Sequence, residues 1–113
     1  MYVICVLVPR PVIVSHPSSQ YINLTQNAIF TCTTTGYNVS YQWKIGSGSF
    51  PSKVTGINSN TLVIPDVRSS DDNTYTCVAS NQRGSVSSNT ARLLVIGMCI
   101  GICMVIVRYI LVR

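Results

Sequence analysis

The sequence predicts an all-β protein that folds as a two-sheet antiparallel sandwich with Greek-key connections. Between residues 11 and 95, polar and apolar residues alternate in short runs, and no stretch sustains the period of a helix. Clusters of Gly, Pro, Asn, Asp and Ser separate the runs about every 8–12 residues, which is typical of sandwiches and barrels. With 113 residues, the chain is long enough to close one hydrophobic core.

The runs predict about seven short strands, each with apolar residues at every second position facing inward. Turn-forming segments separate them at 34–38, 46–51, 55–60, 68–73 and 81–84. Pro65 marks where one strand stops pairing, because proline has no N–H to donate. The expected inward residues are Ala28, Phe30, Cys32, Val39, Tyr41, Trp43, Ile45, Leu62, Ile64, Val67, Tyr75, Cys77, Ala79, Ala91, Leu93 and Val95.

The net charge of +5 is distributed in a way that argues against nucleic-acid binding. Residues 11–95 hold five basic and three acidic side chains, and the other three arginines lie near the chain ends. No basic stripe of the kind that follows a phosphate backbone is present. Three aspartates and one histidine offer no pair suited to general acid–base catalysis. We therefore expect no nucleic-acid partner, no enzymatic activity and no bound cofactor.

The five cysteines fall into two settings. Cys32 and Cys77 lie in alternating runs, whereas Cys5, Cys99 and Cys103 lie in purely apolar ones. No C-x-x-C occurs and only one histidine is present, so the usual zinc spacings are missing and we expect no metal. A Cys32–Cys77 pair would imply an oxidising compartment, and two unpaired buried thiols are the alternative.

The residues around these two cysteines resemble the core signature of immunoglobulin domains. Trp43 follows Cys32 by eleven residues, and Asp71-x-Asn73-x-Tyr75-x-Cys77 carries the second half of the signature. The resemblance implies a disulfide between the sheets, the tryptophan packed on it, and a tyrosine whose hydroxyl bonds to backbone just upstream.

The same resemblance implies a basic partner for Asp71 on a neighbouring strand, and Lys53, Arg68 and the other basic residues are all candidates. The motif C-x-A-x-N-x-x-G at residues 77–84 resembles the I-set and C2-like branches of the family. The 33 residues between Trp43 and Cys77 are few for the extra strands of a variable-type domain. Leu62 is expected in the core with Trp43.

Two N-glycosylation sequons occur, at Asn23 and Asn38. Asn23 lies between Ile22 and Leu24, which are expected to face inward, so its own side chain is expected to face solvent. Asn38 lies in a predicted turn. Both are usable if the chain enters a secretory pathway, and both are otherwise ordinary polar residues.

The C-terminal segment 96–112 is a candidate transmembrane helix that could begin as early as residue 93. Residues 93–107 are fifteen consecutive apolar or glycine residues, and continuing to Val112 gives twenty. Arg108 and Arg113 favour a cytoplasmic C-terminus, which places the sandwich outside, where a disulfide persists. The strand expected near residue 95 competes for the same residues, and a buried strand with an apolar remnant is the alternative.

The segment 1–10 contains a run of only seven apolar residues, Tyr2–Val8, and lacks the basic n-region and cleavage site of a secretory signal, so we expect an incomplete leader or the end of an upstream segment. Residues 11–95 form the expected domain. The resemblance implies protein recognition or adhesion at the plasma membrane, by a protein ligand or by homophilic contact between immunoglobulin domains. Secretion is the alternative location, and a structural spacer within a longer receptor is the alternative function. The expected contact residues are Tyr37, Phe50, Gln82 and Arg83, which lie on predicted loops.

Overall fold

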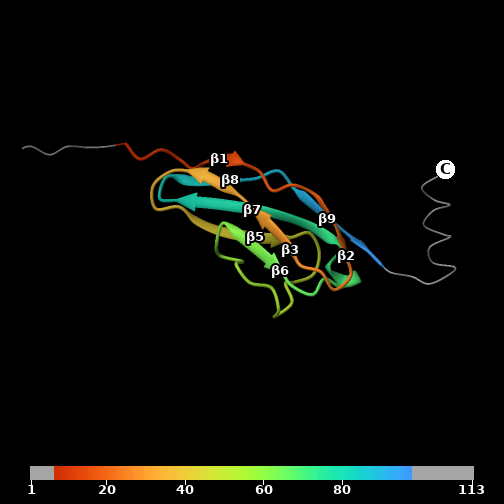
Figure 1. Cartoon of the computed structure of the whole chain (residues 1–113). Coiled ribbons are helices and arrows are strands. Elements are labelled where there is room, and N and C mark those ends of the chain that lie inside the picture. Colours follow the sequence, from red (N-terminus) through yellow and green to blue (C-terminus); the bar gives the residue numbers. More distant parts are fainter. Residues whose placement is uncertain (1–6, 98–113) are drawn as a thin grey trace, which may run out of the picture.

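The computed structural model describes residues 7–97, and these residues confirm the all-β prediction (Figure 1). They form nine strands and one turn of 3-10 helix. The elements are β1 (Val12–Ser15), β2 (Gln20–Asn23), β3 (Ala28–Thr31), β4 (Thr33–Thr35), β5 (Ser40–Ile45), β6 (Thr61–Ile64), η1 (Ser69–Asp71), β7 (Asn73–Asn81), β8 (Gly84–Ser87) and β9 (Ala91–Ile96).

The strands lie in two layers. One layer has the order β2-β9-β7-β5, with β8 pairing the far part of β7. The other consists of the pairs β1-β4 and β3-β6, in which β3 and β4 follow one another along the chain. The N-terminal residues and the β7–β8 hairpin lie at one end of the molecule, and the end of β9 lies at the other (Figure 1).

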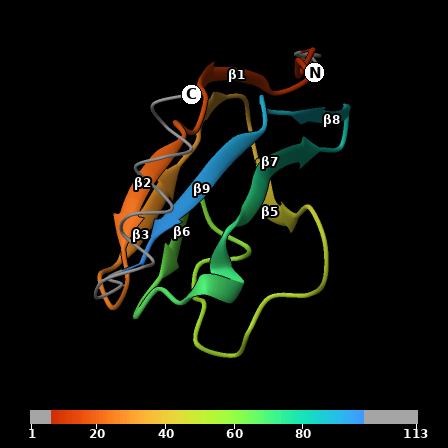
Figure 2. The same cartoon turned by 90° about the vertical axis from the view of Figure 1, so that its right-hand side faces the viewer.

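One strand pair departs from the antiparallel prediction. β2 runs parallel to β9, with Tyr21 opposite Leu94 and Asn23 opposite Ile96 (Figure 2). The chain reaches this position because β1 pairs with β4 in one layer, and β2 then crosses to the edge of the other layer. The prediction of a purely antiparallel sandwich is therefore wrong at this edge.

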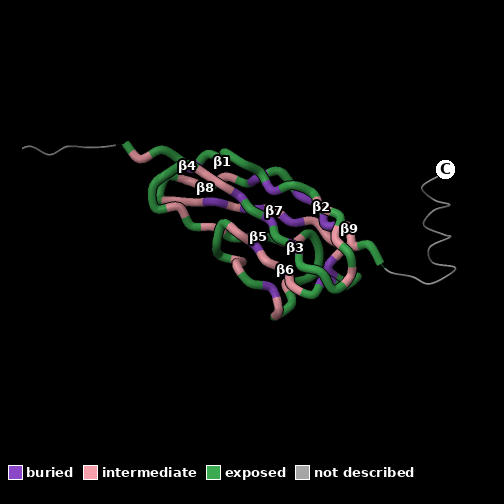
Figure 3. Tube along the Cα trace, viewed as in Figure 1, coloured by how far each residue is buried: buried purple, intermediate pink, exposed green. Residues whose placement is uncertain are grey.

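The core lies between the two layers and contains most of the residues that the alternation predicts, although Val39 is only half-buried and lies outside it (Figure 3). Trp43 donates its indole N–H to the carbonyl of Ser59 at 2.8 Å, so its one polar atom is satisfied although the ring is buried. Phe30 stacks on Tyr75 with ring centroids 5.3 Å apart. The fully buried residues include Ala28, Phe30, Cys32, Leu62, Ile64, Val67, Cys77, Ala79, Ala91 and Leu93.

More strands form than the seven expected because two long paths are interrupted. Cys32 separates β3 from β4, and its N–H bonds to the carbonyl of Asn60 at 2.9 Å. Residues 88–90 separate β8 from β9. There the buried Ser88 takes over the pairing, because its hydroxyl accepts the N–H of Cys77 at 3.0 Å and its own N–H donates to the Cys77 carbonyl at 2.8 Å.

Strand β9 occupies residues that the predicted membrane segment was expected to share with the sandwich. Leu93 is fully buried, and β9 pairs with β2 through Ile96, one residue beyond the expected domain end. The described residues therefore assign 93–96 to the sandwich, and the predicted transmembrane segment stays a prediction for the residues that follow. Residues 98–112 of the predicted transmembrane segment and residues 1–6 of the N-terminal segment lie outside the described part of the chain. Between residues 7 and 97, no helix is long and apolar enough to span a bilayer.

Candidate functional site

The N-terminal end of the sandwich brings together three segments that are far apart in the sequence. These are residues 7–11, the turn 36–39 before β5, and the two-residue hairpin loop between β7 and β8. Gly36 has φ +126° and lies close to Pro11 and Val39, so a larger residue would collide there. We refer to this surface as the N-terminal pole.

Asn81 holds the three segments of the N-terminal pole together. Its side-chain NH2 donates to the carbonyl of Pro9 at 2.9 Å and to the carbonyl of Tyr37 at 3.3 Å. Its side-chain oxygen accepts the N–H of Arg83 at 2.8 Å, which fixes the hairpin turn. The motif at residues 77–84 includes Asn81 but gives no sign of these long-range bonds.

A shallow apolar hollow of about 340 Å³ lies at this pole. Leu7, Val8, Pro9 and Tyr37 line it. Leu7 is 83% exposed and Tyr37 is 65% exposed, so large apolar groups face solvent around it. Exposed apolar groups of this size are the type of surface that protein contacts bury.

Three of the four predicted contact residues lie exposed at the N-terminal pole: Tyr37, Gln82 and Arg83. The prediction that Phe50 is exposed is wrong. Its ring stacks on Tyr75 with centroids 6.0 Å apart and packs against the core, because the loop 46–51 folds inward over the end of the sandwich. Sequence reasoning missed Leu7, Pro9 and Arg10, whose position depends on how residues 7–11 run along the folded domain.

Positive charge is left unbalanced at the N-terminal pole. Each of the three aspartates pairs with one base: Asp66 with Arg68, Asp71 with Lys53, and Asp72 with Arg92. Among residues 7–97 this leaves Arg10, Lys44 and Arg83 without an ion-pair partner. Arg10 lies against Gly84, beside the hairpin that carries Arg83. The N-terminal pole therefore offers apolar contact area next to two cationic groups.

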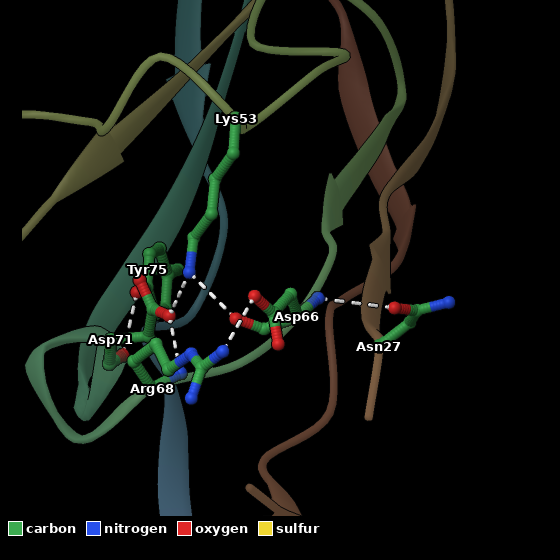
Figure 4. A network of polar contacts seen from close by, with 6 residues as sticks. All are labelled: Asn27, Lys53, Asp66, Arg68, Asp71 and Tyr75. Atoms are coloured by element: carbon green, nitrogen blue, oxygen red, sulfur yellow. Dashed lines mark hydrogen bonds and ion pairs between the residues drawn. The ribbon is translucent and has the colours of Figure 1, made fainter. Parts of the chain in front are cut away.

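The opposite end of the sandwich holds the polar network around Asp71 (Figure 4). Asp71 is 2% exposed, and its Oδ2 accepts Lys53 Nζ at 2.6 Å and the backbone N–H of Arg68 at 2.8 Å. The structure thus identifies Lys53 as the ion-pair partner, while Arg68 pairs with Asp66. The hydroxyl of Tyr75 donates to the carbonyl of Asp71 at 2.7 Å.

Burial raises the pKa of Tyr75 to about 12, and the negative charges of Asp71 and Asp72 add to the shift. The phenol remains protonated in the folded state after it would ionise in the unfolded chain, whose pKa is about 10. Since the unfolded chain then binds fewer protons, stability falls as pH rises between about 10 and 12.

We expect this loss to appear as a slope of about 1.4 kcal/mol per pH unit in the free energy of unfolding across that window. Urea titrations at several pH values would measure it. The variant Tyr75→Phe should be less stable at neutral pH by about 1–2 kcal/mol and should lack this part of the slope. An equal slope in the variant and the wild type would contradict the assignment.

The described residues offer little to catalysis or metal binding. Between residues 7 and 97, no group of three or more His, Cys, Asp or Glu side chains is arranged to hold a metal ion. Each aspartate is engaged in an ion pair, and the exposed His16 accepts the N–H of Asn89 at 2.9 Å through Nδ1. Both sequon asparagines are exposed: Asn23 at the end of β2 and Asn38 at the N-terminal pole, beside Tyr37.

The disulfide prediction is confirmed. Cys32 and Cys77 are bonded across the two layers, with Cα atoms 6.4 Å apart. Both cysteines are fully buried, and Trp43 lies opposite Cys77 in the β5–β7 pair. The bridge, the tryptophan and the Tyr75 hydrogen bond occupy the positions that the sequence resemblance implies.

Comparison with known proteins agrees with this arrangement. A family model described as "Immunoglobulin domain" matches residues 10–81. The chain is 33% identical over 93 residues to human Protein turtle homolog B, covering 75% of this chain and 7% of that protein. It is 34% identical over 71 residues to human Cell adhesion molecule 4, covering 61% of this chain and 18% of that protein.

A solved structure, titin M4, superposes with a TM-score of 0.70 at 26% identity and covers 80% of this chain and all of that one. The chain spans less than a fifth of the length of the two human relatives. The family match, the disulfide and the two-layer fold lead to one conclusion. The chain belongs to the immunoglobulin domain family.

Proposed function

We propose that the chain is a cell-surface recognition module that contacts other proteins through its N-terminal pole and catalyses no reaction. The observation that carries the proposal is the exposed apolar hollow between Tyr37 and residues 7–9, next to Arg10 and at the same pole as the exposed Arg83. Aromatic and arginine side chains are the residue types that contribute most to protein interfaces. The name of a relative, Cell adhesion molecule 4, supports the same class of function.

The hydrogen bonds of Asn81 support this use of the pole because they hold its parts in place before a partner arrives. A loop that is already ordered loses less entropy on binding than a mobile one. The partner surface that fits best presents an apolar side chain to the hollow and carboxylates to the two arginines. A second copy of the same pole fits less well, since both poles would bring the unpaired positive charges of Arg10 and Arg83 into the contact.

A membrane location is the second part of the proposal. The tail after β9 is apolar, and Gly97–Val112 offers sixteen residues, about 24 Å of helix at about 1.5 Å per residue. This length is below the ~30 Å hydrocarbon core, so Arg108 would extend its side chain toward the headgroups. The disulfide supports an extracellular sandwich, and the exposed sequon at Asn38 is then open to glycosylation, whereas Asn23 lies opposite Ile96 at the membrane end of the sandwich.

The membrane location predicts a defined result on blots of the chain expressed in secretory-competent cells. After a carbonate wash, the chain should remain in the membrane pellet, and N-glycosidase should lower its apparent mass. The variants Asn23→Gln and Asn38→Gln show which sequon carries the glycan. Release by carbonate, with no shift in mass, would contradict both the anchoring and the glycosylation.

Recognition is tested separately, by mixing cells that display the chain with dye-labelled cells that do not. We expect mixed clusters, and we expect Tyr37→Ala to reduce them while the control Tyr21→Ala, at the other end of the sandwich, leaves them unchanged. Clusters made only of displaying cells would indicate homophilic contact. Surface display without any clusters would contradict a recognition role and favour a spacer within a longer receptor.

A further inference from the structure

The end of the sandwich opposite the N-terminal pole carries a second apolar surface. Tyr21 on β2 lies opposite Leu94 on β9, and Asn23 lies opposite Ile96. The core residues Ile22, Leu93 and Val95 alternate with them, so Tyr21, Leu94 and Ile96 point away from the core on one face. Tyr21 is 72% exposed and Ile96 is 46% exposed. We refer to these three residues as the β2–β9 patch.

The β2–β9 patch lies where the chain leaves the domain. Ile96 is the last residue of β9, and only Gly97 separates it from the apolar tail. Strands lie about 4.8 Å apart and rise about 3.3 Å per residue, so Tyr21 is within about 8 Å of Ile96. Figure 2 shows β2 and β9 side by side as they run toward this end.

We propose that the β2–β9 patch rests on the headgroup region of the bilayer that receives the C-terminal segment. This inference depends on the proposed membrane anchoring. Because only Gly97 lies between Ile96 and the apolar residues that begin at Met98, no polar linker separates the sandwich from the proposed membrane segment. The end of β9 therefore lies at the bilayer surface, and the β2–β9 patch lies there too.

The chemistry of the patch suits this location. A tyrosine ring favours the membrane interface because its body is apolar and its hydroxyl is polar. The neighbouring Asp72 is neutralised, since its carboxylate accepts Arg92 Nη2 at 2.8 Å and the N–H of Val95 at 3.0 Å. The carboxylates at this end of the sandwich thus present little unpaired negative charge to phospholipid headgroups.

Tryptophan fluorescence tests the proposal because the wild-type chain has one tryptophan, Trp43, and it is buried. The full chain, made without glycans, is reconstituted in phosphatidylcholine vesicles containing a headgroup-labelled nitroxide lipid. The variants Tyr21→Trp and Tyr37→Trp place a reporter at each end of the sandwich, at positions of similar exposure. The wild-type emission is subtracted from each.

We expect the nitroxide to quench the added tryptophan of Tyr21→Trp, with a blue shift in unlabelled vesicles, and to leave that of Tyr37→Trp unchanged. If the chain resists carbonate extraction but Tyr21→Trp is not quenched, the patch does not meet the bilayer, and the anchoring still stands. Equal quenching of both variants would also overturn the assignment of this face. Extraction of the chain by carbonate would contradict both the membrane anchoring and the contact of the β2–β9 patch with the bilayer.

Discussion

Replacing Cys32 and Cys77 by alanine will lower the free energy of unfolding by about 4 kcal/mol. The bridge joins residues 45 apart, and closing a loop of this length removes about that much chain entropy from the unfolded state. A small domain has only about 5–15 kcal/mol of net stability, so the double variant should be close to unfolded at physiological temperature. Urea unfolding followed by Trp43 fluorescence measures the change.

Reduction supplies a control for the cysteine prediction without any mutation. Dithiothreitol should shift the wild-type urea midpoint toward that of the double variant, and should leave the double variant where it is. The two sulfur atoms are also lost from a buried site, so a small additional packing cost is expected in the variant alone. Equal midpoints for the oxidised wild type and the double variant would show that the bridge contributes nothing.

The core was predictable because it depends on local periodicity, whereas the bridge was implied by the resemblance of the residues around Cys32 and Cys77 to immunoglobulin domains. Apolar side chains at every second position identify the inward face of a strand wherever that face is buried. Phe30, Leu62 and Leu93 accordingly lie at 0% exposure. The strand breaks were harder to foresee. Ser88 substitutes for backbone pairing only because the fold brings it opposite Cys77, and a serine in sequence carries no sign of that contact.

Only part of the N-terminal pole could be predicted, because its long-range contacts leave no local pattern in the sequence. Turn-forming residues placed Tyr37 and Arg83 on loops, and both are exposed. Phe50 also lies in a turn-rich segment, but its ring packs on Tyr75 and the core, because burying an apolar ring there is more favourable than leaving it in water. The contribution of Pro9 depends on a hydrogen bond to Asn81, 72 residues away, which no local pattern encodes.

Replacing Asp71 by alanine will lower the free energy of unfolding by about 3 kcal/mol, whereas replacing its neighbour Asp72 will cost about 1 kcal/mol. Asp71 is buried, and its loss leaves the N–H of Arg68 without its acceptor and Lys53 without its counter-ion. Lys53 is 27% exposed and also donates to the carbonyl of Asp66, so water and that bond limit the cost.

Asp72 is the matched control, because it is adjacent in sequence and makes two bonds of similar length. It is more exposed than Asp71, and its partner Arg92 is largely in solvent, so water replaces most of what the substitution removes. A double-mutant cycle of Asp71→Ala with Lys53→Ala separates the ion pair from the bond to Arg68. If the two substitutions lower the free energy of unfolding equally, the burial of Asp71 does not make its interactions more stabilising than those of Asp72. A larger cost at Asp71 means that its burial and its two bonds, to Lys53 and to the N–H of Arg68, stabilise the turn before Tyr75 more than the exposed pair of Asp72 does.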